Sequence, residues 1–217
     1  GWTFRSPDLA RTLERIAEQG RDGFYRGELA SLLVDGVRAA GGNWTLHDLA
    51  KYEAKEREPF ALDYRGWDIV TAPPPSSGGI AVAEMLNMLS GYDLGKLDRV
   101  HRLHLTVEAM RRAYRDRAEY LGDPDHVEMP LRMLTSADYA AGLRASINPG
   151  KATPSDMLPG YLNPPQGTHT SHFSIIDKDG NLVSGTQTVN LGLGSAFVVP
   201  GSGFVLKRVE GLDITFK

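Results

Sequence analysis

Apolar positions in the first two thirds of the chain recur mainly at helical spacing. Between Ser6 and Gly20 they fall three and four residues apart, on one helical face. Ser6 and Pro7 suit an N-cap and a first helical turn, and Gly20 suits the position after the last turn. The same reasoning predicts further helices over residues 26–40, 45–52, 80–90, 98–121 and 136–147.

Two of these helices differ in how their apolar residues are distributed. The helix over residues 80–90 is apolar nearly all round, which predicts burial on both sides. The helix over residues 98–121 carries an apolar stripe expected to face a core, formed by Val100, Leu103, Val107, Met110 and Tyr114. Its basic run at residues 111–115 has acids close by, which is typical of a solvated helix face.

Strand patterns occupy two regions. Residues 60–64 and 67–70 flank Arg65-Gly66, which suits a tight hairpin. Residues 172–177 and 181–190 flank Lys178-Asp179-Gly180, and Asp-Gly between two β-rich runs is a strong hairpin signal. Short strands are also expected over 196–199 and 203–206, whereas 148–169 is rich in Pro, Gly, Ser and Asn and predicts an irregular surface stretch. Helices followed by a sheet indicate an α+β fold.

Composition narrows the function classes without selecting one. The chain has 217 residues, a formal net charge of −3 and no cysteine. The charge gives no reason to expect nucleic acid or anionic lipid as a partner, and no run approaches the roughly 20 apolar residues of a membrane span. The absence of cysteine excludes disulfides, thiolate metal ligands and a Cys nucleophile. The first five residues contain no apolar signal-peptide region.

Candidate chemistry concentrates where the long irregular stretch enters a strand. Residues 168–174 read Thr-His-Thr-Ser-His-Phe-Ser, so hydroxyl side chains open the strand. Threonine at a strand start is ordinarily explained by β-propensity, and from the residues alone Thr170 is either such a residue or a nucleophile. His101 and His104 could share a helix face, but with no third ligand nearby no metal site is expected.

Three segments together resemble the γ-glutamyltransferase family of N-terminal-nucleophile hydrolases. They are residues 73–79 (Pro-Pro-Pro-Ser-Ser-Gly-Gly), the helix and turn over 107–125, and residues 170–190. Their order and spacing both fit, and the likeness runs from about Ser6 to Leu206. The resemblance implies part of an αββα sandwich. Residues 1–169 would match the mostly helical end of the large subunit, and 170–217 the β-rich start of the small subunit.

The resemblance also implies a mechanism. The precursor would cut itself between His169 and Thr170, and Thr170 would then carry the γ-glutamyl group as an ester. Thr188 matches the family threonine that bonds the nucleophile, and Asn190 matches an asparagine that contacts the α-amino and carboxylate end of the substrate. Glutathione or another γ-glutamyl compound would be the donor and water or an amino acid the acceptor, with no cofactor or metal. Family members suggest a periplasmic or secreted location.

Other interpretations stay open. A related acylase, acting on glutaryl cephalosporins or poly-γ-glutamate, would use the same fold, and a non-catalytic fragment is the alternative from another class. Residues after Leu206 do not resemble the family's Gly-Gly oxyanion hole, and losing oxyanion donors costs about 10²–10³ in rate. We therefore expect the isolated chain to stay uncut before Thr170 and to be inactive as a transferase.

Overall fold

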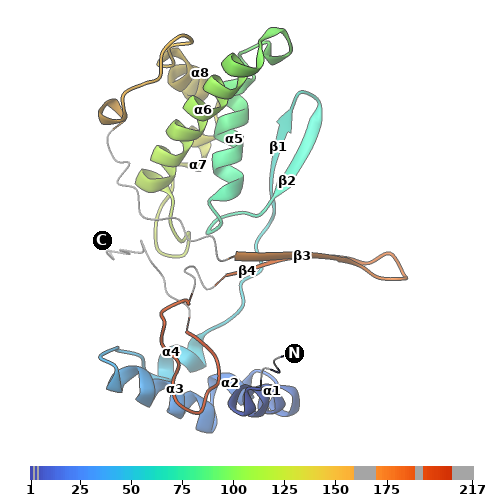
Figure 1. The fold of residues 1–217 in the computed structure, drawn as a ribbon, viewed down its shortest axis with the longest axis vertical. Helices are drawn as coiled ribbons and strands as arrows, with labels where there is room; N and C mark the ends of the chain where they lie inside the picture. The colour runs from blue at the N-terminus through green and yellow to red at the C-terminus, as the bar shows by residue number, and fades with distance from the viewer. Residues whose placement is uncertain (2, 4, 159–169, 189–192, 207–217) are drawn as a thin grey trace. The chain divides into compact units, whose positions relative to one another are not determined.

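The computed structural model describes every residue except 2, 4, 159–169, 189–192 and 207–217 (Figure 1). The chain divides into two compact units. The first contains Gly1–Ala54 and Asn163–Lys217, and the second contains Lys55–Leu162. Helices and two antiparallel hairpins are both present in the described residues, which confirms the α+β class.

Four helices open the first unit: α1 Pro7–Gln19, α2 Asp22–Tyr25, α3 Gly27–Ala39 and α4 Leu46–Lys51. Pro7 begins α1 as predicted and Gly20 ends it with a φ of 58°. The expected side-chain cap from Ser6 is wrong, because Ser6 contributes only its carbonyl, which accepts from the N–H of Ala10 at 3.0 Å. At α4 the predicted capping box is present between Thr45 and Asp48.

Residues 193–206 complete the core of this unit by packing on α3. Val199 is buried among Leu33, Val34 and Val37 of that helix. A Cβ at Gly36 would collide with Val199, so the glycine permits this close approach. Thr12 of α1 donates a buried hydrogen bond of 2.8 Å from its hydroxyl to the carbonyl of Ser202.

The two short strands expected in this segment are wrong. Within 193–206 the structure has one isolated bridge, between Val198 and Val205. Ala196, Gly201 and Gly203 have φ values of 55°, 85° and 78°, which turn the chain away from an extended path. The apolar side chains of the segment are therefore buried by turns that fold onto α3.

The second unit begins with the predicted hairpin, β1 Phe60–Tyr64 and β2 Trp67–Thr71. Arg65 and Gly66 both have positive φ, 56° and 81°, the backbone of a two-residue type I′ turn. The remaining elements are α5 Gly78–Leu89, η1 Leu94–Lys96, α6 Arg99–Tyr120, α7 Leu131–Leu134, α8 Ala137–Ala145 and η2 Ser155–Met157.

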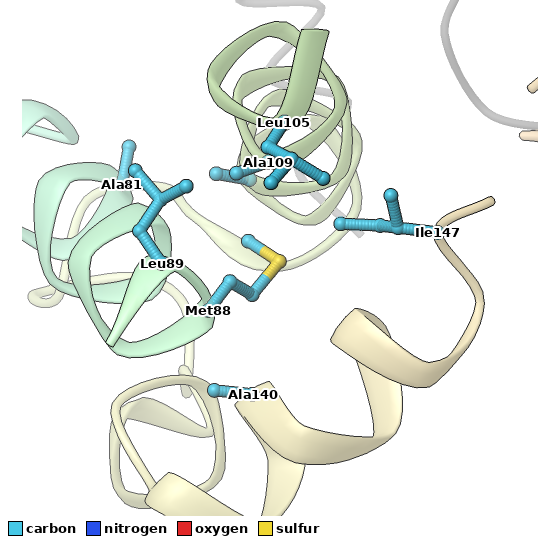
Figure 2. Packing of buried hydrophobic residues seen from close by; sticks show 8 residues of the cluster. Ala81, Met88, Leu89, Leu105, Ala109, Ala140 and Ile147 are labelled. Atoms are coloured by element: carbon cyan, nitrogen blue, oxygen red, sulfur yellow. The ribbon is translucent and has the colours of Figure 1, made fainter. Parts of the chain in front are cut away.

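Packing of α5, α6 and α8 forms the core of the second unit (Figure 2). α5 contributes Ala81, Met88 and Leu89, and most of its surface is buried or half-buried as predicted. α6 presents Leu105 and Ala109 to it, and the small alanine lets the two helix backbones approach closely.

The predicted core face of α6 is wrong. Val100 is 74% exposed and Leu103 is 62% exposed, and Val107 and Met110 are exposed as well. Tyr114, the fifth residue of the predicted face, is half-buried. We call the four exposed residues the α6 stripe. The face that is buried instead carries one leucine, two alanines and three charged residues: Leu105, Ala109, Ala113, Glu108, Arg112 and Asp116. The prediction was based on hydrophobicity alone, which does not take into account that buried charges can neutralise one another.

Glu108 and Arg112 form such a neutralised pair. Their side chains are 2% and 1% exposed, and the guanidinium donates to the carboxylate at 2.6 Å. The hydroxyl and N–H of Thr153 also donate to Glu108, at 2.6 and 3.0 Å. Burial would raise the pKa of Glu108, but the bonds from Thr153 and Arg112 lower it to about 2. The network corrects one expectation, because Arg112 is buried and not solvated. It also anchors the stretch near Thr153 to α6, and residues 148–154 are mostly exposed and irregular as expected.

A second buried cluster joins α5, α6 and α8. Glu84 is 1% exposed and Asp116 is fully buried. Asp116 accepts a hydrogen bond of 2.8 Å from the hydroxyl of Tyr139, while neither carboxylate oxygen of Glu84 has a partner in the described part of the chain. Burial, and secondarily the nearby Asp116, raises the pKa of Glu84 to about 9. Glu84 is therefore a neutral acid at neutral pH.

Replacing Glu84 with Gln should make the chain less sensitive to high pH. The raised pKa means that the folded state keeps a proton that the unfolded state loses, so the free energy of unfolding falls as pH rises from about 4.5 to about 9. Gln does not titrate, and at pH 8 the variant should lose roughly 4 kcal/mol less than wild type, relative to pH 5. Urea unfolding at the two pH values measures this. The exposed Glu119→Gln is the control, and equal declines for Glu84→Gln and wild type would contradict the assignment.

Glu108→Ala should destabilise the chain by about 3–5 kcal/mol, because it leaves the guanidinium of Arg112 buried without its carboxylate. The double variant Glu108→Leu with Arg112→Met removes both charges and should recover much of that loss. Denaturant unfolding at pH 7 compares the two variants, with the exposed Glu119→Ala expected within roughly 0.5 kcal/mol of wild type. A double variant as unstable as Glu108→Ala would refute the paired-charge explanation.

Candidate functional site

The candidate nucleophile begins a strand of an antiparallel hairpin. β3 spans Thr170–Ile176 and β4 spans Leu182–Thr188, so the hairpin predicted around Asp179-Gly180 is confirmed, with β3 starting two residues earlier than expected. The carboxylate of Asp177 accepts from the N–H groups of Asp179 and Asn181, at 2.9 Å each, and Gly180 has a φ of 83°. These contacts close the turn and set which residues face each other along the strands.

The register gives the hairpin two different faces. Thr170 lies opposite Thr188, His172 opposite Thr186, and Ser174 opposite Ser184. Because side chains alternate along a strand, these six residues share one face, which we call the hydroxyl face. The other face carries Phe173 opposite Gly185 and Ile175 opposite Val183.

Thr170 and Thr188 are in direct contact. The hydroxyl of Thr170 donates to the hydroxyl oxygen of Thr188 at 2.9 Å. Both side chains are exposed. A donated hydrogen bond fixes the rotamer of the Thr170 hydroxyl and leaves its oxygen lone pairs free to attack a carbonyl. The arrangement suits a nucleophile, although the catalytic roles of both residues stay predictions.

The two other predicted site residues, His169 and Asn190, lie outside the described residues. His169 would contribute the carbonyl at the cleavage junction, and Asn190 would contact the substrate. Their expected roles therefore stay predictions from the sequence.

A histidine that sequence reasoning did not select lies at the centre of the hydroxyl face. His172 Nδ1 is 2.8 Å from the hydroxyl oxygen of Thr186. Its Nε2 is 3.1 Å from the hydroxyl of Ser184 and 3.3 Å from that of Ser174. Period-two alternation from Thr170 was the available signal, because it places residue 172 on the nucleophile's face.

The other two segments singled out in the sequence meet in the second unit. Residues 73–79 lead into α5, and the Pro74-Pro75 peptide bond is cis. The hydroxyl of Ser77 accepts a hydrogen bond of 2.8 Å from Nε of Arg117 on α6. A Cβ at Gly79 would lie 2.6 Å from Cγ2 of Thr71, so glycine allows β2 and α5 to meet. The contacts of these two segments join α5 to α6 and to β2, so they contribute to the packing of the second unit.

Among the described residues, no group of three or more His, Asp or Glu side chains is placed to hold a metal ion. No described helix has the length and apolar character that crossing a membrane requires. A hollow of about 500 Å³ is lined by α3 and residues 197–200 and does not include Thr170.

Comparison with known proteins identifies relatives over nearly the whole chain. Residues 1–213 match the family described as Gamma-glutamyltranspeptidase. The glutathione hydrolase proenzyme of Pseudomonas sp. (strain A14) is 48% identical over 212 residues. That alignment covers 97% of this chain and 37% of the relative.

Two solved structures are similar in fold as well as sequence. The γ-glutamyltranspeptidase of Helicobacter pylori has a TM-score of 0.68 and 39% identity, covering 75% of this chain and 48% of its own. The cephalosporin acylase of Bacillus halodurans has a TM-score of 0.80 and 31% identity, covering 99% of this chain and 38% of its own.

The matches show how much of a relative this chain spans and where along the chain the likeness to the family ends. The chain spans little more than a third of the curated relative's length. The family match continues to residue 213, so the expectation that the likeness ends at Leu206 is wrong.

Proposed function

The chain belongs to the γ-glutamyltranspeptidase family, and we propose that Thr170 is the residue through which the full-length protein transfers γ-glutamyl groups. The observation that supports the proposal is the 2.9 Å contact between the hydroxyls of Thr170 and Thr188. It joins the two threonines that the family resemblance selects, on one face of one hairpin. Glutathione and related γ-glutamyl compounds are the proposed donors, with water or an amino acid as acceptor.

Self-cleavage is the first proposed step. The Thr170 hydroxyl attacks the carbonyl carbon of His169, the peptide C–N bond breaks, and an ester replaces it. Water then hydrolyses the ester, giving a carboxylate on His169 and restoring the hydroxyl of Thr170. The nitrogen of Thr170 becomes a free α-amine beside that hydroxyl, as in other nucleophiles activated by an N-terminal amine.

The α-amine then serves as the base for turnover. Such amines titrate near ~7.7–8.0, so a useful fraction is neutral at physiological pH. The amine takes the hydroxyl proton as Thr170 attacks the γ-carbonyl of the donor, and returns it to the departing amine. Water or an amino acid next attacks the γ-glutamyl ester and releases Thr170. In this scheme Thr188 orients the nucleophile, and Asn190 binds the α-amino and carboxylate groups of the donor.

The proposed fold around this site is the αββα sandwich of N-terminal-nucleophile hydrolases, with the subunit boundary before Thr170. Two exposed apolar surfaces support it. One is the α6 stripe. The other is on the hairpin, where Phe173, Ile175 and Val183 are 43%, 55% and 54% exposed. Each surface would be removed from water by a further layer of the full-length fold.

A glutaryl acylase is the second candidate, because the similarity to the cephalosporin acylase covers 99% of this chain. Glutaryl and γ-glutamyl groups differ by the α-amino group, so the two activities separate in a direct comparison. Hydrolysis of a γ-glutamyl anilide should exceed that of the matching glutaryl anilide if the transferase proposal holds. The reverse preference would favour the acylase, and no turnover of either would favour the non-catalytic alternative.

Thr170→Ala in the full-length protein should abolish self-cleavage and turnover together, because one hydroxyl performs both steps. Thr170→Ser keeps a hydroxyl and should retain measurable cleavage. Gel electrophoresis and intact mass follow the two fragments, and N-terminal sequencing of the smaller one should begin at residue 170. Two fragments from the Ala variant would show that the nucleophile is a different residue.

Thr188→Val should slow turnover by roughly 10–10²-fold, because Val keeps the shape of Thr but cannot accept the hydrogen bond from Thr170. The measurement is kcat with a γ-glutamyl anilide, on protein that has completed self-cleavage. Gln187→Ala, on the opposite face of β4, is the control and should change kcat less than about threefold. Unchanged kcat in Thr188→Val would remove Thr188 from the mechanism.

A further inference from the structure

The residue types on the hydroxyl face are compatible with more than one pairing register of β3 and β4. Thr188, Thr186 and Ser184 follow one another on this face of β4. A two-residue slip of β4 would place Thr186 opposite Thr170, and one hydroxyl would simply replace another. A slip by two residues also preserves which side chains lie on each face, so alternation alone does not prevent it. The turn closed by Asp177 sets the register from one end, and contacts along the strands are needed to keep Thr188, and not Thr186, against Thr170 at the other end.

His172 makes contacts that depend on the observed register. Its Nδ1 lies 2.8 Å from the Thr186 hydroxyl and its Nε2 lies 3.1 Å from the Ser184 hydroxyl. The ring thus bridges two successive positions of β4 from one position of β3. After the same slip it would face Ser184 and Leu182, and Leu182 has no side-chain hydrogen-bonding group.

The opposite face reinforces this register at one position. Gly185 lies opposite Phe173, and a Cβ there would lie 2.9 Å or less from two ring atoms of Phe173. Slipped pairing would set the Phe173 ring against Val183, where a branched side chain stands in the space that Gly185 leaves open. The aromatic ring and the imidazole therefore favour the same alignment from opposite faces.

We propose that His172 is a positioning residue for the nucleophile: it holds the register of β3 and β4 at the end of the hairpin away from the turn, and so keeps the Thr188 hydroxyl opposite that of Thr170. This inference rests on the proposed function of Thr170. It gives His172 no contact with the substrate and no proton transfer. Its effect on the reaction passes entirely through the pairing of Thr170 with Thr188.

The test is a double-mutant cycle in the full-length protein. His172→Ala should slow self-cleavage and lower kcat by roughly 10–10²-fold, with KM changed less than about threefold. His172 acts through Thr188, so its removal should matter little once Thr188 is changed. The self-cleavage rate and kcat of the double variant His172→Ala with Thr188→Val should therefore lie within about threefold of those of Thr188→Val alone. Losses that multiply in the double variant would overturn the inference.

Conservative variants separate positioning from a general loss of folding. His172→Asn keeps a polar atom near the Nδ1 position and the bond to Thr186, and His172→Gln keeps one near Nε2 and the bond to Ser184. At least one of these two variants should cleave itself at a rate within about fivefold of the wild-type rate. If neither does, the inference is overturned. Gln187→Ala is the matched control on the other face.

Thr170→Ala distinguishes this failure from failure of the proposed function. If Thr170→Ala still cuts itself, the nucleophile is misassigned and both proposals fall. If Thr170→Ala is inert but His172→Ala matches wild type, the nucleophile stands and the role of His172 is wrong.

Discussion

The register between β3 and β4 is the constraint on which the candidate site depends. Thr170 and Thr188 are 18 residues apart, and only one alignment of the two strands places their hydroxyls 2.9 Å from each other. The turn closed by Asp177 sets that alignment from one end. The side chain of His172, and Phe173 against Gly185, favour it along the strands. A hydroxyl placed this way has a defined direction before any substrate arrives, which is the kind of preorganisation that catalysis by proximity requires.

The second unit shows how charge can replace hydrophobicity at a helix interface. α6 buries Glu108, Arg112 and Asp116 and leaves its most apolar stripe exposed. The Glu108–Arg112 pair is tolerated because Thr153 supplies two further hydrogen bonds to the carboxylate. Glu84 and Asp116 are tolerated differently, since the raised pKa of Glu84 keeps it neutral.

The sequence allowed the hairpins and most helices to be predicted, because these depend on local signals such as Asp179-Gly180 at the turn between β3 and β4. The Thr170–Thr188 pair was expected from the family resemblance, because local signals alone do not say which residues of two strands face each other. The buried face of α6 could not be predicted, because a stripe of Val and Leu outweighs charges whose partners lie 34 to 45 residues away, at Ser146 and Thr153. The strands expected in residues 196–206 failed for a related reason. Their apolar residues pack on α3, a long-range contact that local propensity does not contain. His172 was passed over because the role of a single histidine follows from its cross-strand neighbours.

The most direct test of the account is to locate the γ-glutamyl group during turnover. The full-length protein, allowed to complete self-cleavage, would be mixed with a γ-glutamyl anilide, quenched in acid within the first turnovers, digested and mapped by tandem mass spectrometry. A γ-glutamyl ester is expected on the side chain of Thr170, in a peptide whose N-terminus is Thr170 itself. A γ-glutamyl group on any other residue, or active protein in which the bond between His169 and Thr170 is intact, would contradict it.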